Sequence, residues 1–107
     1  MRALFICSRN RWRSPTAEEV FAMWPGVETD SAGLAPDAVV TLTSEQLAWA
    51  EIIFVMERTH QAKLSKRFGE YLKGKRVVCL SIPDQYTFMQ PELVALLEQR
   101  VGKYLRA

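Results

Sequence analysis

The stretch Ala3-Leu4-Phe5-Ile6-Cys7-Ser8-Arg9-Asn10-Arg11-Trp12-Arg13-Ser14-Pro15 passes from an apolar run, through a polar loop with three arginines, to a proline. The apolar run of residues 3–6 predicts a buried strand. Proline suits the first turn of a helix, because its fixed φ and missing N–H cost little there. A strand that runs through a short loop into a helix is the building unit of α/β folds.

Three more segments predict strands, and helical patterns alternate with them. The four predicted strands cover residues 3–6, 27–30, 52–56 and 77–80. The run 52–56 is apolar on both faces, as a buried parallel strand should be. Strict alternation of strands and helices predicts one α/β domain over residues 1–107, with helices on both faces of a parallel sheet.

Four helical patterns lie between and after these strands. The first ends at Pro25-Gly26 and places its apolar residues on one face: Ala17, Val20, Phe21 and Trp24. Thr43 and Gln46 form the pattern of a capping box before the second helix. The third covers residues 59–68 and is stopped by Gly69. The fourth opens at Pro91 and carries an apolar stripe: Leu93, Leu97, Val101 and Tyr104 or Leu105. Residues 33–41 are expected to form a loop.

Composition narrows the functional classes. The chain has 107 residues, 49% of them apolar and 24% charged, and a formal net charge of +2. This is typical of a packed globule, and it is not the strongly basic footprint of a nucleic-acid binder. No apolar run reaches the ~20 residues of a membrane span. Two cysteines and one histidine are too few for a structural zinc site, and we expect a cytoplasmic protein with reduced cysteines and no cofactor.

The polar loop has the composition of a phosphate site. Backbone N–H groups in a loop between a strand and a helix can cradle an anion, helped by the helix N-terminus. That positive field favours the thiolate form of Cys7 as a nucleophile. Arg13 is placed to grip two phosphoryl oxygens, and the Ser14 hydroxyl to donate to the sulfur. We expect Ser8, Arg9, Asn10, Arg11, Trp12, Arg13 and Ser14 to surround the phosphoryl group, which passes through a phosphocysteine.

A second part of the site is expected where the last predicted strand ends. Ligands bind beyond the carboxyl ends of the strands in open parallel sheets. Asp84 follows the strand 77–80 closely enough to reach the same edge as Cys7. Asp84 could be a plain turn residue after Pro83, but its place at this edge favours a role as the general acid. Trp12 is expected at the rim, able to stack on an aromatic substrate, while Arg9 and Arg11 attract anions.

The chain resembles the low-molecular-weight protein tyrosine phosphatases, and within them a short bacterial group of predicted phosphatases. Residues 4–7 followed by Asn10, Arg13-Ser14-Pro15 and Ala17-Glu18 match the N-terminal signature of that family. Matches continue at Ser31-Ala32-Gly33, at Phe54-Val55-Met56-Glu57, and at Asp84 with Tyr86. The resemblance implies a phosphatase I-like three-layer α/β/α fold with a four-stranded parallel sheet of order 2-1-3-4.

The same resemblance implies a role for each matching residue. Cys7 would be the nucleophile, Arg13 the phosphate clamp and Asp84 the acid that later activates water. Asn10 and Ser31 would hold the loop, and Tyr86 would line the pocket mouth together with Trp12. The implied activity is metal-independent hydrolysis of a phosphotyrosine protein or a small aryl phosphate, with phosphate and other oxyanions as ligands.

The sequence also departs from the family pattern. Arg9 stands where glycine is usual, and Trp12 stands where a second cysteine usually protects the nucleophile by forming a disulfide. Gln85 replaces the proline that usually follows the acid, and Glu57 stands at the usual Asp. The chain is about a third shorter than typical members, mainly after Gly33, where the family carries a substrate-contacting loop.

Three other functions stay open at this stage. A IIB-like component of a sugar phosphotransferase system would share the phosphocysteine but would need neither Arg13 nor Asp84. An arsenate reductase would need further redox cysteines, whereas Cys79 is expected to be an inert core residue inside a strand. A silent phospho-binding module would keep only the loop and Arg13. We expect His60 to be a surface residue at a helix start, without a role, and Trp24 and Trp49 to pack on helix faces.

Overall fold

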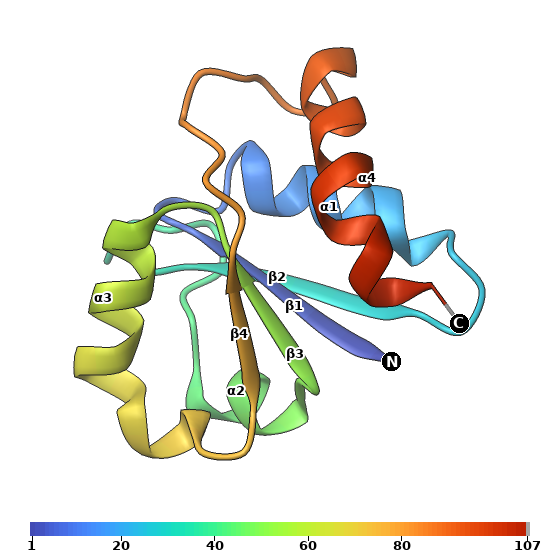
Figure 1. The fold of residues 1–107 in the computed structure, drawn as a ribbon. Helices are drawn as coiled ribbons and strands as arrows, with labels where there is room; N and C mark the ends of the chain where they lie inside the picture. Colours follow the sequence, from blue (N-terminus) through green and yellow to red (C-terminus); the bar gives the residue numbers. More distant parts are fainter. Residues whose placement is uncertain (107) are drawn as a thin grey trace.

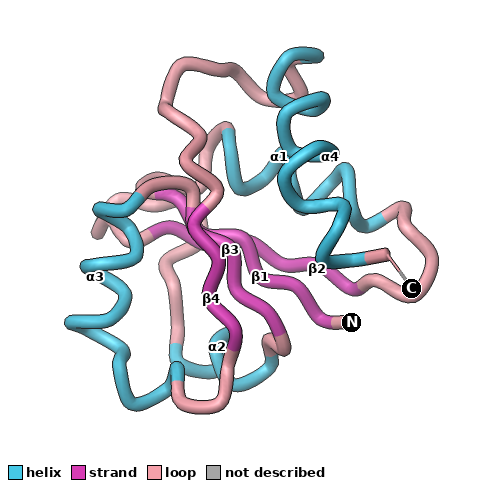
Figure 2. The backbone as a smooth tube through the Cα atoms, viewed as in Figure 1, coloured by secondary structure: helices cyan, strands magenta, loops and turns pink. Residues whose placement is uncertain are grey.

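The structure is a computed structural model that describes residues 1–106. Four strands and four α-helices alternate along the chain (Figures 1 and 2). In order they are β1 (Arg2–Cys7), α1 (Arg13–Ala22), β2 (Glu28–Gly33), α2 (Ser44–Trp49), β3 (Ile52–Val55), α3 (Arg58–Phe68), a 3₁₀ turn η1 (Gly69–Leu72), β4 (Arg76–Cys79) and α4 (Pro91–Leu105).

The strands form one parallel sheet in the order β2-β1-β3-β4. This confirms the expected order 2-1-3-4. In register, Cys7 at the end of β1 pairs with Gly33, and Ile6 pairs with Val55. Because all four strands run the same way, the segments that follow β1, β3 and β4 leave the sheet at one edge.

The side chains of β1 alternate between two apolar layers, which makes the fold three-layered. Phe5 stacks on Phe21 and Phe54, with ring centroids 5.8 and 5.2 Å apart, on the face covered by α1 and α4. Leu4 and Ile6 point the other way, into the layer under α2 and α3. Figure 1 shows α1 and α4 together on one side of the sheet and α3 with α2 on the other. Alternation along a strand with period two produces this division.

Most element boundaries agree with the sequence patterns. The capping box of Thr43 and Gln46 is present, and the stripe of α4 is buried along its length. The helix α1 begins at Arg13, so Pro15 lies in its first turn, as predicted. The strand β2 differs: it runs on to Gly33, past the predicted range 27–30, because its pairing with β1 continues to Cys7. Polar residues are tolerated there because β2 is an edge strand.

The loop after β2 folds back onto the phosphate loop. The Leu34 N–H donates to the Cys7 carbonyl at 3.1 Å, and the Ala35 N–H donates to the Ser8 carbonyl at 2.8 Å. Gly33 is required by this approach, because a Cβ at that position would lie 2.5 Å from the Ser8 carbonyl oxygen.

Residues 1–106 contain no helix with the length and apolar character of a membrane span.

Candidate active site

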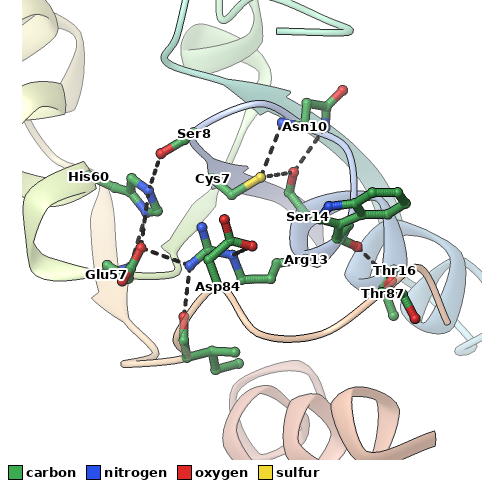
Figure 3. Close-up of polar contacts among 12 residues, drawn as sticks. Cys7, Ser8, Asn10, Arg13, Ser14, Thr16, Glu57, His60, Asp84 and Thr87 are labelled. Carbon is green, nitrogen blue, oxygen red and sulfur yellow. Dashed lines mark hydrogen bonds and ion pairs between the residues drawn. The ribbon is translucent and has the colours of Figure 1, made fainter. Parts of the chain in front are cut away.

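Cys7 lies at the base of the loop that joins β1 to α1. Its side chain is buried, and its Sγ atom is 3.0 Å from the Ser14 Oγ. The Asn10 backbone N–H donates to the same sulfur at 3.2 Å. The loop therefore curls around the thiol, as Figure 3 shows, and supplies hydrogen-bond donors that stabilise negative charge on the sulfur.

Asn10 fixes the shape of this loop. Its φ of 57° lies in the left-handed region, which asparagine adopts more readily than most residues. Its buried Nδ2 donates to the Ser14 Oγ and to the Ser31 Oγ, at 2.9 Å each. Because the Ser14 oxygen accepts this bond, its own O–H is free to donate, and the sulfur at 3.0 Å lies nearer to it than the Ala32 carbonyl at 3.5 Å. These are the contacts that the supporting roles expected of Asn10, Ser14 and Ser31 require.

Arg13 is a buried cation that lies after β1 and contacts the segments that follow β3 and β4. Its Nη1 donates to the Glu57 Oε2 and to the Ile82 carbonyl, both at 2.8 Å. Its Nε lies 3.7 Å from the Asp84 Oδ1. Glu57 lies two residues after the end of β3, and Ile82 and Asp84 lie after the end of β4. The carboxylates offset the charge that burial would otherwise penalise, and they hold the guanidinium near Cys7.

His60 lies inside the site, so the expectation of a surface residue without a role is wrong. It is 1% exposed, and it accepts the Glu57 backbone N–H at its Nδ1, 3.1 Å away. The proton therefore sits on Nε2, which lies 2.9 Å from the Ser8 Oγ and donates to it. Burial, and then the positive charge of Arg13, lower the pKa of His60 from 6.5 to about 4. The ring is thus a neutral link between the phosphate loop and Glu57.

A cavity of about 300 Å³ opens above the thiol. It is lined by Cys7, Ser8, Arg9, Arg11, Trp12, Arg13 and Asp84. The structure thus brings the predicted nucleophile, clamp and acid together. Asn10 and Ser14 are buried behind the lining and contact the sulfur from there. Arg9 is also 3.7 Å from Asp37 in an exposed ion pair.

Two residues lie elsewhere than expected. Tyr86 was expected at the pocket mouth, but it does not line the cavity and packs, partly buried, against the core under α1 and α4. Cys79 was expected in the core, but it is only partly buried, because it ends the edge strand β4. Trp24 and Trp49 pack against the two core layers, as expected.

Cys79 is too far from Cys7 to act as its redox partner without movement of the backbone. Cys79 pairs with Val55, and Val55 pairs with Ile6, so two strand spacings, roughly 10 Å, separate Cys79 from β1. A disulfide needs Cα atoms within about 7 Å of each other. Both cysteines are free thiols. Among residues 1–106, no cluster of three or more histidine, cysteine or acidic side chains is arranged to hold a metal ion.

Glu57 and His60 are the site residues that the sequence patterns did not single out for these roles. Glu57 was noted only as part of a family match, at a position where Asp is usual. The available signal was topological, because β3 neighbours β1 and its C-terminal residues must emerge beside the phosphate loop. Two polar residues in the first turn after β3, Glu57 and His60, therefore lie beside that loop.

The chain is similar to solved phosphatases. A YwlE arginine phosphatase mutant with a phosphorylated active-site serine is 25% identical, with 98% of this chain and 95% of that chain covered and a TM-score of 0.73. The tyrosine phosphatase Wzb from Escherichia coli K30, in complex with phosphate, is 22% identical, with 96% and 94% covered and a TM-score of 0.78. A low-molecular-weight protein tyrosine phosphatase from T. tengcongensis is 22% identical, with 95% and 93% covered and a TM-score of 0.71.

No protein-family model matches the sequence, and a search of curated proteins finds no match. The structural likeness nevertheless extends over nearly the whole chain. The chain therefore has the fold of the low-molecular-weight protein tyrosine phosphatases, which confirms the resemblance drawn from its sequence.

Proposed function

We propose that this chain is a metal-independent phosphomonoesterase that acts on phosphotyrosine or a related aryl phosphate. The observation that carries the proposal is a single cavity that contains the Cys7 thiol, the Arg13 guanidinium and the Asp84 carboxyl group. These three groups come from β1, from the start of α1 and from the segment after β4. Nucleophile, clamp and acid are the parts that phosphoryl transfer through a covalent intermediate requires.

In the first step, the Cys7 thiolate attacks phosphorus and the bond from phosphorus to the leaving oxygen breaks. Protonated Asp84 donates its proton to that oxygen, so the leaving group departs as a neutral alcohol or phenol. In the second step, water attacks the phosphocysteine, and the Asp84 carboxylate accepts its proton. The S–P bond breaks, inorganic phosphate leaves, and the Ser14 hydroxyl stabilises the sulfur as a thiolate.

Arg13 is oriented for bidentate binding of the phosphoryl group. Both of its short hydrogen bonds, to Glu57 and to Ile82, are made by Nη1. The edge formed by Nε and Nη2 forms no hydrogen bond within residues 1–106. That edge matches two phosphoryl oxygens, as guanidinium groups do in phosphate sites. Arg13 and the loop N–H groups together supply the charge stabilisation that a metal ion would give.

The rim of the cavity favours an aromatic leaving group. Trp12 is 41% exposed at the rim and offers an indole face for stacking. Arg11, which forms no ion pair within residues 1–106, also lines the rim, and its positive charge opposes the approach of a guanidinium. Of the two activities that the similar structures carry in their names, the rim therefore favours tyrosine over arginine phosphatase chemistry for this chain.

Two of the alternative functions fit the geometry less well. A phosphoryl carrier would not need an acid in the cavity with its cysteine, yet Asp84 lines it. A reductase would need a second thiol near Cys7, and Cys79 lies two strands away. Two reduced thiols fit a cytoplasmic setting, where disulfides are rare. We therefore propose hydrolysis, in one domain of residues 1–107.

The test is hydrolysis of p-nitrophenyl phosphate, phosphotyrosine and phosphoarginine in the presence of EDTA. Wild type should hydrolyse both aryl substrates and should prefer phosphotyrosine to phosphoarginine. Cys7→Ser should lose turnover but retain phosphate or vanadate binding. Cys79→Ser is the control for removing a thiol, and it should leave turnover nearly intact. Phosphate binding without any turnover by wild type would identify a silent binding module instead.

A further inference from the structure

A second hollow adjoins the cavity above Cys7. Its volume is about 470 Å³, and its lining is mostly apolar. Arg11 and Trp12 line both hollows, so the two share a wall made by the phosphate loop. We call the second one the apolar groove and define it by its apolar lining: Trp12, Pro15, Val39, Val40 and Phe88.

The apolar groove gathers side chains that solvent reaches. Val39 is 70% exposed, Val40 and Phe88 are each 45% exposed, and Trp12 is 41% exposed. Single exposed apolar residues are ordinary on protein surfaces. Four of them around one hollow, drawn from three separate segments of the chain, form the kind of patch that marks a binding site.

Hydrogen bonds to the phosphate loop, to the end of β2 and to α1 hold both walls of the groove. The Val39 N–H donates to the Arg9 carbonyl at 3.0 Å, and the Val40 carbonyl accepts the Gly33 N–H at 2.8 Å. On the other side, the Met89 N–H donates to the Thr16 Oγ1 at 2.9 Å, and that hydroxyl donates to the Trp12 carbonyl at 2.6 Å. The groove is thus preformed, which lowers the entropic cost of binding.

The lining of the apolar groove also contains charged residues. The two acidic residues of the lining are engaged, because Glu18 accepts the Ser31 hydroxyl and Asp30 accepts the Gln46 side chain. Within residues 1–106, Arg11 forms no ion pair and stands between the groove and the cavity. A ligand that fits both hollows therefore combines a phosphoryl group and an apolar side chain.

We propose that the apolar groove binds an apolar side chain of a phosphotyrosine protein substrate, from a residue close in sequence to the phosphotyrosine. This inference rests on the proposed function and specifies its substrate as a protein segment. An extended peptide advances ~3.3 Å per residue. Since the two hollows share a wall, a residue within about three positions of the phosphotyrosine reaches the groove.

The test uses phosphotyrosine peptides in a serine and glycine background, with a single leucine placed in turn at each position from three before to three after the phosphotyrosine. We expect leucine at the best position to raise kcat/KM about tenfold over the peptide without leucine, through KM, as expected for one apolar side chain in a pocket. The double substitution Val40→Ser with Phe88→Ser should reduce this advantage to less than about threefold.

Two controls separate the groove from the catalytic machinery. The double variant should hydrolyse p-nitrophenyl phosphate within about twofold of wild type, because that substrate has no side chain for the groove. Met23→Ser is the matched surface control: Met23 is 84% exposed and lies past the far end of α1, roughly 15 Å from the phosphate loop. It should retain the full leucine advantage.

The outcomes for the two proposals are distinguishable. A leucine advantage that is absent in wild type, or unchanged in the double variant, overturns the groove while turnover of p-nitrophenyl phosphate leaves the proposed function intact. If wild type shows no turnover, the proposed function fails, and fluorescence anisotropy of the same peptides on Cys7→Ser decides the groove by the same criterion. A wild-type dimer that the double variant loses in sedimentation would assign the groove to a second copy of the chain.

Discussion

Lowering the pH from 7 to 5 should destabilise this protein through its one histidine, His60. The buried ring accepts the Glu57 N–H at Nδ1, so a second proton at that atom would remove an acceptor and place charge next to Arg13. Burial and Arg13 lower the pKa of His60 to about 4 in the folded protein, from 6.5. The unfolded chain therefore takes up a proton at a pH where the folded chain does not.

The size of the effect follows from linkage. Well above pH 6.5, protonation of His60 does not affect the free energy of unfolding. Below pH 6.5, it lowers that free energy progressively, until the pH reaches the folded pKa near 4. The slope is about 1.36 kcal/mol for each pH unit. Between pH 6.5 and 5 this amounts to a loss of about 2 kcal/mol, which is a large share of the ~5–15 kcal/mol that stabilises a typical domain.

The assay is urea denaturation of wild type and of His60→Gln at pH 7 and at pH 5. Glutamine is neutral at both values, and it keeps one donor and one acceptor for Ser8 and Glu57. Carboxyl groups titrate alike in both proteins, so the difference between the two losses isolates the histidine. We expect wild type to lose about 2 kcal/mol more than the variant. Equal losses would show that His60 is not held neutral by this environment, and would refute the assignment of its role.

Four further predictions concern the active site. Asp84→Asn should reduce kcat/KM far more on phenyl phosphate than on p-nitrophenyl phosphate, because only the poorer leaving group needs the ~10²–10⁴-fold help of an acid; equal losses would limit Asp84 to shaping the loop. Arg13→Lys keeps the charge but loses the planar fork, and should cost at least about a hundredfold in kcat/KM, about 3 kcal/mol; a milder loss would point to another clamp. Peroxide should inactivate the enzyme irreversibly, with Cys7 oxidised to the sulfinic acid; recovery with dithiothreitol and a disulfide to Cys79 in mass spectra would contradict the strand spacing. Gly33→Ala should lower both the melting temperature and phosphate affinity, because the added Cβ meets the phosphate-loop backbone; an unchanged melting temperature would show that the loop yields at little cost.

The main features of the fold were predictable because they depend on burial and on topology. The apolar run of residues 3–6 and its passage into a polar loop predicted a strand, a phosphate site and a helix in that order, and all four residues of the run are buried. Asp84 could be placed near Cys7, despite its distance in sequence, because the carboxyl ends of parallel strands share an edge. Neither inference needs the identity of individual side-chain contacts.

Other features depend on contacts that sequence patterns do not contain. His60 has the appearance of an ordinary polar residue at a helix start, and only the pairing of β3 with β1 places it against Ser8. Tyr86 lies in a segment between β4 and α4 where Ser81 and Met89 adopt left-handed backbone angles. The direction of a side chain in such irregular backbone follows from packing, which here turns Tyr86 toward the core.

The two carboxylates beside Arg13, those of Glu57 and Asp84, differ in exposure and in distance from the guanidinium, and this difference suits them to different roles. Glu57 is 38% exposed, and its Oε2 lies 2.8 Å from Nη1, within ordinary hydrogen-bond distance. Asp84 is 61% exposed, and its Oδ1 lies 3.7 Å from Nε, too far for such a bond. A carboxylate bound tightly to the clamp fixes its orientation, whereas one that is loosely held and open to solvent can exchange a proton with a leaving group or with water. Because the Glu57 N–H is in turn bound by His60, the tighter carboxylate is anchored from both sides, and Asp84 is left as the one that can serve as acid and then as base.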